Sequence, residues 1–166
     1  MKAIVVYESL WGNTAAVARA IAEGIGPEAR ALSTTEATAE VTAGADLIVA
    51  GAPLHAFRLS SEKMRKDVSE DPKNAKNPPD ISHPLMRTWL AGLPKGKGKA
   101  AAFETRFKWS PGGAAESIMK ELKRAGYSRT GKTQKFLVTG VEGPLKEGEA
   151  ERARAWGGEL AEAMKS

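Results

Sequence analysis

Residues 2–14 read KAIVVYESLWGNT, and this stretch decides the fold. Its first half, Lys2 to Tyr7, is a run of β-branched and apolar residues typical of a strand covered on both faces of a sheet. Its second half is polar and contains a glycine. From Asn13 to Gly24, Val17 and Ile21 then recur at the four-residue spacing of a helix. The stretch therefore predicts a strand, a tight loop and a helix in immediate succession.

The rest of the chain repeats this alternation of short apolar runs and amphipathic segments. The pattern predicts further strands over 29–33, 46–51, 100–103 and 135–140, and helices over 86–93, 113–125 and 148–164, with a short Thr/Glu/Ala-rich helix after residue 33. Strands that alternate with helices form parallel sheets with helices on both faces. We expect an α/β fold around a five-stranded parallel sheet.

Residues 60–83 break the alternation. They begin with mixed charges and continue as Asp71-Pro72-Lys73-Asn74-Ala75-Lys76-Asn77-Pro78-Pro79, in which prolines and polar residues oppose regular structure. We expect an exposed excursion without a core of its own. A chain of 166 residues with 42% hydrophobic content is short for two ordinary domains, so we expect one domain over 1–166.

Composition excludes several kinds of chemistry. The chain has no cysteine, which excludes disulfides, thiolate metal ligands and thiol redox chemistry, so a redox role requires a bound cofactor. We identify no metal site and no set of catalytic side chains. The short apolar run at the N-terminus lacks the features of a signal peptide, and no segment approaches the ~20 apolar residues of a membrane span. These features predict a soluble cytoplasmic protein.

The loop from Ser9 to Thr14 predicts an anion site. It offers hydroxyls, an amide side chain and a glycine at the N-terminus of a helix, where unpaired backbone amides and the helix dipole favour negative charge. It contains no lysine or arginine, so a monophosphate suits it better than a triphosphate with magnesium. The alternative is that Ser9, Asn13 and Thr14 only cap the helix.

This loop resembles the phosphate loop of the flavodoxin family, a Ser/Thr-x-Thr-Gly-x-Thr stretch that follows the first strand. Trp11 stands where the family usually has a threonine. The resemblance extends over the chain in the order and length of its elements. It implies a flavodoxin-like fold, FMN as the ligand, and phosphate contacts from Ser9, Leu10, Trp11, Gly12, Asn13 and Thr14.

The same resemblance implies that the flavin ring lies between the loops after the third and fourth strands. Large aromatic side chains recur in both loops, and such side chains cost solvation unless a planar ligand covers them. The alternative is that Phe57 and Phe107 fold back onto the core. The residues predicted to contact the ring are Pro53, Leu54, His55, Ala56 and Phe57 in one loop, and Glu104, Thr105, Arg106, Phe107 and Trp109 in the other.

The charge of the two ring loops differs from that of the electron-carrying flavodoxins that the chain resembles. Those carriers are strongly acidic around the flavin, whereas this chain has Arg58, Arg106 and Lys108 in the two loops. We therefore expect a hydroquinone couple less negative than is usual in the family. Ala56 is the counterpart of the small residue beside flavin N5, where the family often uses glycine.

The resulting functional prediction is an FMN-binding electron carrier between a reductase and an acceptor enzyme. The alternatives are a small FMN-dependent oxidoreductase acting on a quinone- or porphyrinogen-like substrate, and a cofactor-free flavodoxin-like interaction module. The net charge of +5 and pI near 9.5 are compatible with acidic redox partner proteins. No aromatic platform for nucleic acid is present.

One motif is a decoy. The stretch Gly126-Tyr127-Ser128-Arg129-Thr130-Gly131-Lys132-Thr133 matches the spacing of a nucleotide phosphate loop. That loop requires a strand before it and a helix after it, whereas here the pattern predicts a helix before and a strand after. We therefore interpret Gly126 as a helix C-cap.

Overall fold

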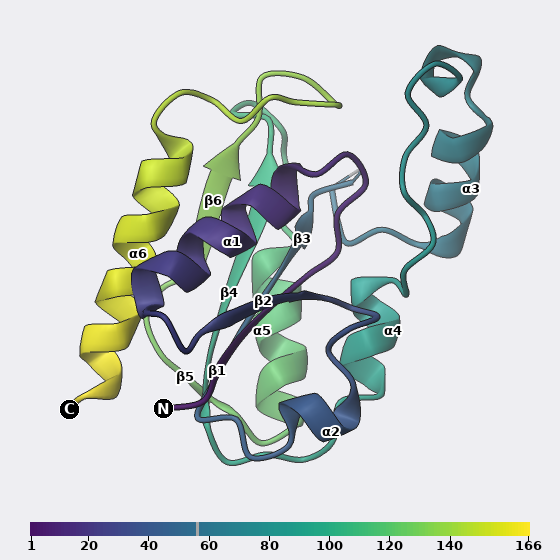
Figure 1. Ribbon diagram of the computed structural model, residues 1–166. Coiled ribbons are helices and arrows are strands. Elements are labelled where there is room, and N and C mark those ends of the chain that lie inside the picture. The colour runs from purple at the N-terminus through teal and green to yellow at the C-terminus, as the bar shows by residue number, and fades with distance from the viewer. Residues whose placement is uncertain (56) are drawn as a thin grey trace.

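The structure is a computed structural model that describes residues 1–55 and 57–166. Helices lie on both faces of a central sheet, and one helical excursion projects beyond it (Figure 1). The strands are β1 (Ala3–Tyr7), β2 (Arg30–Ser33), β3 (Leu47–Pro53), β4 (Lys99–Arg106), β5 (Ser128–Arg129) and β6 (Gln134–Leu137). The helices are α1 (Asn13–Ile25), α2 (Ala39–Thr42), α3 (Glu62–Glu70), α4 (Met86–Ala91), α5 (Ala115–Arg124) and α6 (Glu149–Met164), with a 3₁₀ turn η1 (Pro72–Asn74).

All of the strands pair in parallel, in the order β2-β1-β3-β4-β5, and β6 also pairs with β4. From β1 the chain runs outward to β2 and then returns to the other side of β1 as β3. In such sheets the loops after the two strands at this reversal diverge and leave a crevice for a ligand. The loops after β1 and β3 are the ones that the sequence marks as unusual.

The edge beside β4 adds one short strand to the five that the sequence predicts. The strand predicted over 135–140 is found as β6, which pairs with the end of β4, and β5 is an additional two-residue strand that pairs with its start. The intervening turn contains Gly131 at φ 72° and is held by Glu116, which accepts bonds from Arg129 and Thr133. The stretch 126–133, which matches the spacing of a nucleotide phosphate loop, lies between α5 and β6. Gly126, at φ 99°, follows α5, and a strand rather than a helix comes next.

The core is divided between the two faces of the sheet because side chains of a strand alternate. Ile4 and Val6 point to the face covered by α4 and α5, whereas Val5 points to the face covered by α1 and α6. On the second face the rings of Phe103, Phe136 and Trp156 pack edge to face or tilted, with centroids 6.0–6.4 Å apart. Burial on both faces explains why the strands are apolar throughout.

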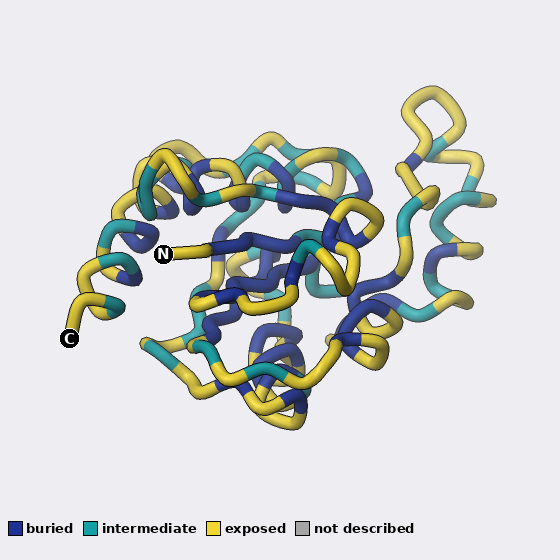
Figure 2. Tube along the Cα trace, turned by 60° about the horizontal axis from the view of Figure 1, so that its bottom comes forward, coloured by how far each residue is buried: buried dark blue, intermediate teal, exposed yellow. Residues whose placement is uncertain are grey.

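The excursion over 60–83 is only partly as expected. It is largely exposed, as Figure 2 shows, and Arg65 is the buried residue of α3. The prediction missed α3 itself, which the mixed charges concealed. The Ser61 hydroxyl accepts a bond from the Met64 amide and starts the helix. The excursion is then held to the sheet end by polar bonds rather than by a core.

The end of β4 also differs from the prediction. β4 continues to Arg106, so that Glu104, Thr105 and Arg106 belong to a buried strand end rather than to a loop. No helix in the described residues is long and apolar enough to cross a membrane.

Candidate functional site

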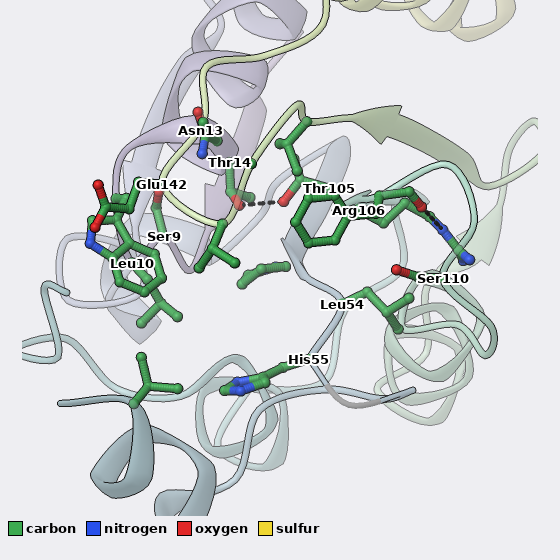
Figure 3. Close-up of a pocket in the computed structure, with 18 of the residues that line it drawn as sticks. Ser9, Leu10, Asn13, Thr14, Leu54, His55, Thr105, Arg106, Ser110 and Glu142 are labelled. Atoms are coloured by element: carbon green, nitrogen blue, oxygen red, sulfur yellow. Dashed lines mark hydrogen bonds between the residues drawn. The ribbon is translucent and has the colours of Figure 1, made fainter. Parts of the chain in front are cut away.

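A cavity of about 870 Å³ lies at the carboxyl edge of the sheet, at the reversal between β1 and β3. It lies between the loop after β1, the ends of β3 and β4, and the excursion (Figure 3). Twelve of the predicted residues line it: Ser9, Leu10, Trp11, Asn13, Thr14, Pro53, Leu54, His55, Thr105, Arg106, Phe107 and Trp109. Gly12, Phe57 and Glu104 do not line it, and Ala56 lies outside the described residues.

The loop after β1 lines the cavity with five of its residues, Ser9, Leu10, Trp11, Asn13 and Thr14. The Ser9 hydroxyl oxygen accepts bonds from the amides of Gly12 and Ala15, at 3.0 and 3.3 Å, so Ser9 does cap the helix. Its hydroxyl hydrogen remains able to donate. Within the described chain, the amides of Asn13 and Thr14 make no hydrogen bond. Gly12 makes the turn possible because its φ of 96° is left-handed. Amides of this kind at a helix N-terminus bind anions.

The base of the cavity is tied together by hydroxyls. The Thr14 and Thr105 hydroxyls are 2.8 Å apart, and both side chains are buried. This bond joins the loop after β1 to the end of β4. Asn13 lies against Gly143, where a Cβ would meet the Asn13 amide oxygen at 2.4 Å. The close approach fixes the loop after β6 beside the loop after β1.

The two loops predicted to hold a flat ring contact each other. The Leu54 amide donates to the Thr105 carbonyl at 2.9 Å, and the Gly113 amide donates to the Phe57 carbonyl at 3.2 Å. His55 and Arg58 exchange two backbone bonds, which turns the chain back on itself. Phe57 has a φ of 76°, a conformation that costs a non-glycine residue about 1 kcal/mol or more.

Of the aromatic side chains in these loops, Phe57 and Trp109 are exposed and Phe107 is half-buried. Phe107 and Trp109 stack with centroids 5.0 Å apart and planes 8° apart, and Trp109 is 78% exposed. Phe57 is 60% exposed. The alternative that Phe57 folds back onto the core is therefore wrong. A stacked aromatic pair at the mouth of a cavity suits a planar ligand.

The charge of Arg106 is neutralised within the protein. Its guanidinium donates to the Glu104 carboxylate at 3.0 Å and to the Gly112 carbonyl at 2.9 Å. Glu104 also accepts bonds from the amides of Ala114 and Ala115 at the start of α5. Of the three basic residues expected in the two loops, Arg106 is thus neutralised. Arg58 and Lys108 are exposed.

His55 is the titratable ring that lines the cavity. Its Nδ1 lies 3.3 Å from the Ser60 hydroxyl. Burial lowers the pKa of His55 below its usual value, and the negative charge of Asp67 partly offsets this. The ring is therefore mostly neutral at pH 7. In Figure 3 it lies across the cavity from Thr14 and Thr105.

Two walls of the cavity were absent from the predicted site. One is the excursion, which contributes Val68, Asp71, Lys73 and Asn74, and the other is the loop after β6, which contributes Val138, Gly140, Val141, Glu142 and Gly143. Ser110 also lines the cavity. The sequence signal for the second wall is Gly140, Gly143 and Pro144, which follow β6 and indicate a turn at the carboxyl edge of the sheet. No local pattern shows that the excursion turns back over the site.

Trp11 joins these walls. Its indole Nε1 donates to the Asn77 carbonyl at 2.8 Å, and the Asp80 amide donates to the Leu10 carbonyl at 2.7 Å. Asn77 donates in turn to the Glu142 carboxylate at 3.1 Å. The tryptophan that replaces the usual threonine of the resembled motif thus anchors the excursion to the loop after β1.

Chemically, the site combines a cation-free anion cradle at one end with apolar and aromatic walls and a neutral imidazole. The groups of three or more acidic or histidine side chains that would hold a metal ion are absent from the described residues. Such a cavity is suited to a planar ligand that carries a monophosphate.

No family model matches the chain, and no curated protein matches it in sequence. Solved structures do match. An archaeal flavodoxin has 25% identity, full coverage of both chains and a TM-score of 0.70. Flavodoxin 1 from Bacillus cereus has 17% identity, coverage of 98% of each chain and a TM-score of 0.64.

A flavodiiron core from Synechocystis sp. matches 98% of this chain at 19% identity and a TM-score of 0.63, but this chain spans only 36% of that one. The overall fold, with its parallel sheet and flanking helices, matches these structures. The chain therefore has the flavodoxin-like fold.

Proposed function

We propose that this protein binds FMN in the cavity and carries electrons between a reductase and an acceptor enzyme. The observation that supports this most is the loop from Ser9 to Thr14. It lines a cavity at the β1/β3 reversal, contains no lysine or arginine, and has two amides, of Asn13 and Thr14, without a partner in the described chain. The likeness to archaeal and bacterial flavodoxins supports the same ligand.

The residues present fit FMN. The amides of Asn13 and Thr14 and the Ser9 hydroxyl would hold the phosphate, while Leu54 and the Phe107–Trp109 pair would lie against the ring. The cavity is within the ~300–1,000 Å³ range of small-molecule sites. When bound, FMN supplies one- and two-electron chemistry that the side chains lack. The protein's own residues bind it, orient it and exclude water from part of it.

The surface charge supports one kind of partner. The net charge of +5, with exposed Arg58 and Lys108 beside the cavity, favours encounter with acidic proteins through long-range attraction. Acidic redox partners are thus part of the proposal. The same two side chains support a redox couple less negative than is usual for flavodoxins.

The test is electron transfer from the reduced, FMN-loaded protein to two forms of one acceptor that differ in charge, basic cytochrome c and its succinylated, acidic form. We expect faster transfer to the acidic form, with a rate that falls as salt rises because screening weakens the attraction. Faster transfer to the basic form, or no dependence on salt, would contradict the proposed partner class. Failure to transfer electrons to either form would contradict the carrier function.

A second candidate is reduction of a small planar acceptor such as a quinone- or porphyrinogen-like compound. The excursion wall favours it, since Val68, Asp71, Lys73 and Asn74 enlarge the cavity beyond the three loops that would hold FMN. The assay is NAD(P)H-dependent quinone reduction by the isolated protein. Turnover without an added reductase supports the enzyme, and its absence supports the carrier. A colourless protein that rejects added FMN supports the cofactor-free module instead.

A further inference from the structure

Residues 77–80 of the excursion, which we call the strap, are bound to the loop after β1. The Asp80 amide donates to the Leu10 carbonyl at 2.7 Å. The Asn77 carbonyl accepts a bond from the indole Nε1 of Trp11 at 2.8 Å. The strap therefore makes two hydrogen bonds with the loop that carries the anion cradle.

The strap has few other contacts to hold it in place. Pro79 is its buried residue, and the other three are exposed. Pro78 and Pro79 have no amide to donate. Among the described residues, the strap makes one further hydrogen bond outside the excursion, from the Asn77 side chain to the Glu142 carboxylate at 3.1 Å. That bond ends on the loop after β6, so the position of the strap depends on the loops after β1 and β6.

The base of the excursion is held separately from the strap. The Arg65 guanidinium donates to the His83 carbonyl, and the Thr34 hydroxyl donates to the Pro84 carbonyl at 2.7 Å. Arg65 is 6% exposed, so its bond is shielded from water. A segment with few buried contacts beside a well-held base can open locally while the rest stays folded.

The loop from Ser9 to Thr14 is shared between the anion cradle and the strap. The amides of Asn13 and Thr14 have no partner within the described chain, whereas Leu10 and Trp11, a few residues earlier, bind the strap. Among the described residues that line the cavity, none belongs to the strap. An anion and the strap can therefore act on the same short loop without contacting each other.

This sharing has an energetic consequence. An anion bound to the amides orders the loop, and so does the closed strap, and ordering a segment costs conformational entropy. Once one of the two has ordered the loop, the other binds without that cost. The two therefore favour each other, and they do so by the same factor because coupling between two sites is reciprocal.

We propose that closure of the strap is coupled to anion binding in the loop from Ser9 to Thr14. The inference rests on the proposed function for the identity of the anion, which is the phosphate of FMN. Strap residues act as positioning residues, since they hold the loop and do not touch the ligand. Filling the cradle thus also fixes the excursion, which forms one wall of the cavity.

The test is hydrogen exchange of the Asp80 amide, followed by NMR in the ligand-free protein. Inorganic phosphate is the probe, chloride at equal ionic strength is the reference, and the Asn13 and Thr14 amide signals report binding. We expect exchange at Asp80 to slow at least about fivefold at saturating phosphate, the lower end of typical coupling between sites. The Asn74 amide, which binds the Asp71 carbonyl within the excursion, is the internal control and keeps its rate.

Two variants separate the loop after β1 from the loop after β6. Trp11→Phe keeps the backbone amides of the cradle but removes the bond to the Asn77 carbonyl. We expect phosphate to slow exchange at Asp80 less than about twofold in this variant, because one of the two bonds that carry the coupling is lost. Asn77→Ala removes the bond to Glu142 and keeps both bonds to the loop after β1, so the full effect of phosphate is retained.

Each other outcome overturns a distinct part of the account. Phosphate that shifts the Asn13 and Thr14 signals without slowing Asp80 would overturn the coupling and leave the proposed function intact. Equal slowing at Asp80 and Asn74 would show general stabilisation of the protein and would also overturn it, as would an undiminished effect in Trp11→Phe. Absence of any shift at Asn13 and Thr14 would contradict the anion cradle itself, and with it both the coupling and the proposed function.

Discussion

Glu104 joins the end of β4 to the start of α5. Its carboxylate pairs with Arg106 at 3.0 Å and accepts two amide bonds at the start of α5, and it is 1% exposed. Glu104→Gln keeps an oxygen for the amides but leaves the buried guanidinium without its counter-charge. We expect a loss of about 3 kcal/mol in the free energy of unfolding, measured by urea denaturation.

The matched control is Glu116→Gln. Glu116 also binds an arginine, Arg129, at 3.0 Å, but its side chain is 66% exposed. Surface pairs contribute ~0–1 kcal/mol, so this change should cost less than about 1 kcal/mol. Equal losses in the two variants would show that burial of the Glu104 pair is not what matters.

The raised pKa of Glu8 predicts that this residue contributes to the free energy of unfolding in a pH-dependent way. Because its pKa is raised in the folded protein, the folded state binds the proton more tightly than the unfolded state does. Its contribution is therefore fully present below the unfolded pKa of about 4.5 and is lost as pH rises through the folded value. Glu8→Gln removes this dependence, so its unfolding free energy relative to wild type should rise with pH over that window.

Urea denaturation of both proteins at several pH values measures this difference. A constant difference across the window would show that folding does not shift the Glu8 pKa. A difference that falls with pH would show a shift in the opposite direction.

Many of the residues lining the cavity could be predicted, because loop residues at the ends of parallel strands meet at one edge. The roles of individual side chains could not. Arg106 looks like a free cation in the sequence, and only its burial beside Glu104 shows that its charge is neutralised. Glu8 gave no signal, since a single acid after a strand is ordinary. Its burial depends on residues far away in the chain that surround it in the fold, among them Ser60, Arg65 and Met86.

At the scale of elements, α1 and α6 approach so closely that glycine is required between them. A Cβ on Gly157 would lie 2.2 Å from the Ile21 carbonyl oxygen, whereas one on Gly158 would lie 3.8 Å from its nearest neighbour, the Gly24 carbonyl oxygen. Gly157→Ala must push the helices apart, and we expect a loss of about 1–3 kcal/mol in unfolding free energy.

Gly158→Ala is the control in the same helix. It gains helix propensity without a clash, so it should be neutral or stabilising by up to about 1 kcal/mol. Thermal or urea unfolding of both variants gives the comparison. Similar effects at the two positions would contradict the close packing of α1 on α6.

The excursion depends on Trp11 for its position over the cavity. Trp11→Phe keeps the ring but removes the indole N–H that binds the Asn77 carbonyl. We expect faster hydrogen exchange over residues 71–83, because the segment has few buried contacts to compensate. Trp109→Phe is the control, since Trp109 is 78% exposed and at the opposite loop. Unchanged exchange in Trp11→Phe would show that the segment is held by its other bonds.

Helices whose apolar residues recur at a regular spacing could be predicted from the sequence, as α1, α5 and α6 show. The failures have physical reasons. β5 contains two residues, which is too few to show the alternation of apolar and polar residues that marks a strand. α3 carries charges on most of its surface, and it is stable here because Ser61 caps it and Arg65 anchors it. β4 runs past its expected end because Glu104 and Arg106 pair and so can be buried.

At the scale of the whole molecule, one reversal of strand order gathers the site. The loops after β1, β3 and β4 are separated by about 40 or more residues of sequence and meet because the strands are parallel neighbours. The Thr14–Thr105 hydroxyl bond spans 91 residues and shows how closely they meet. The anion cradle and the aromatic wall thus belong to one cavity.

The central claim is that the cradle binds the phosphate of FMN, and the direct measurement compares FMN with riboflavin, which lacks the phosphate. Titration of each into the ligand-free protein, followed by flavin fluorescence, gives both dissociation constants. We predict one FMN per chain and binding of riboflavin at least about tenfold weaker, a difference of about 1.4 kcal/mol from charge-assisted bonds to the amides. Equal affinity for the two, or no binding of FMN, would contradict the account.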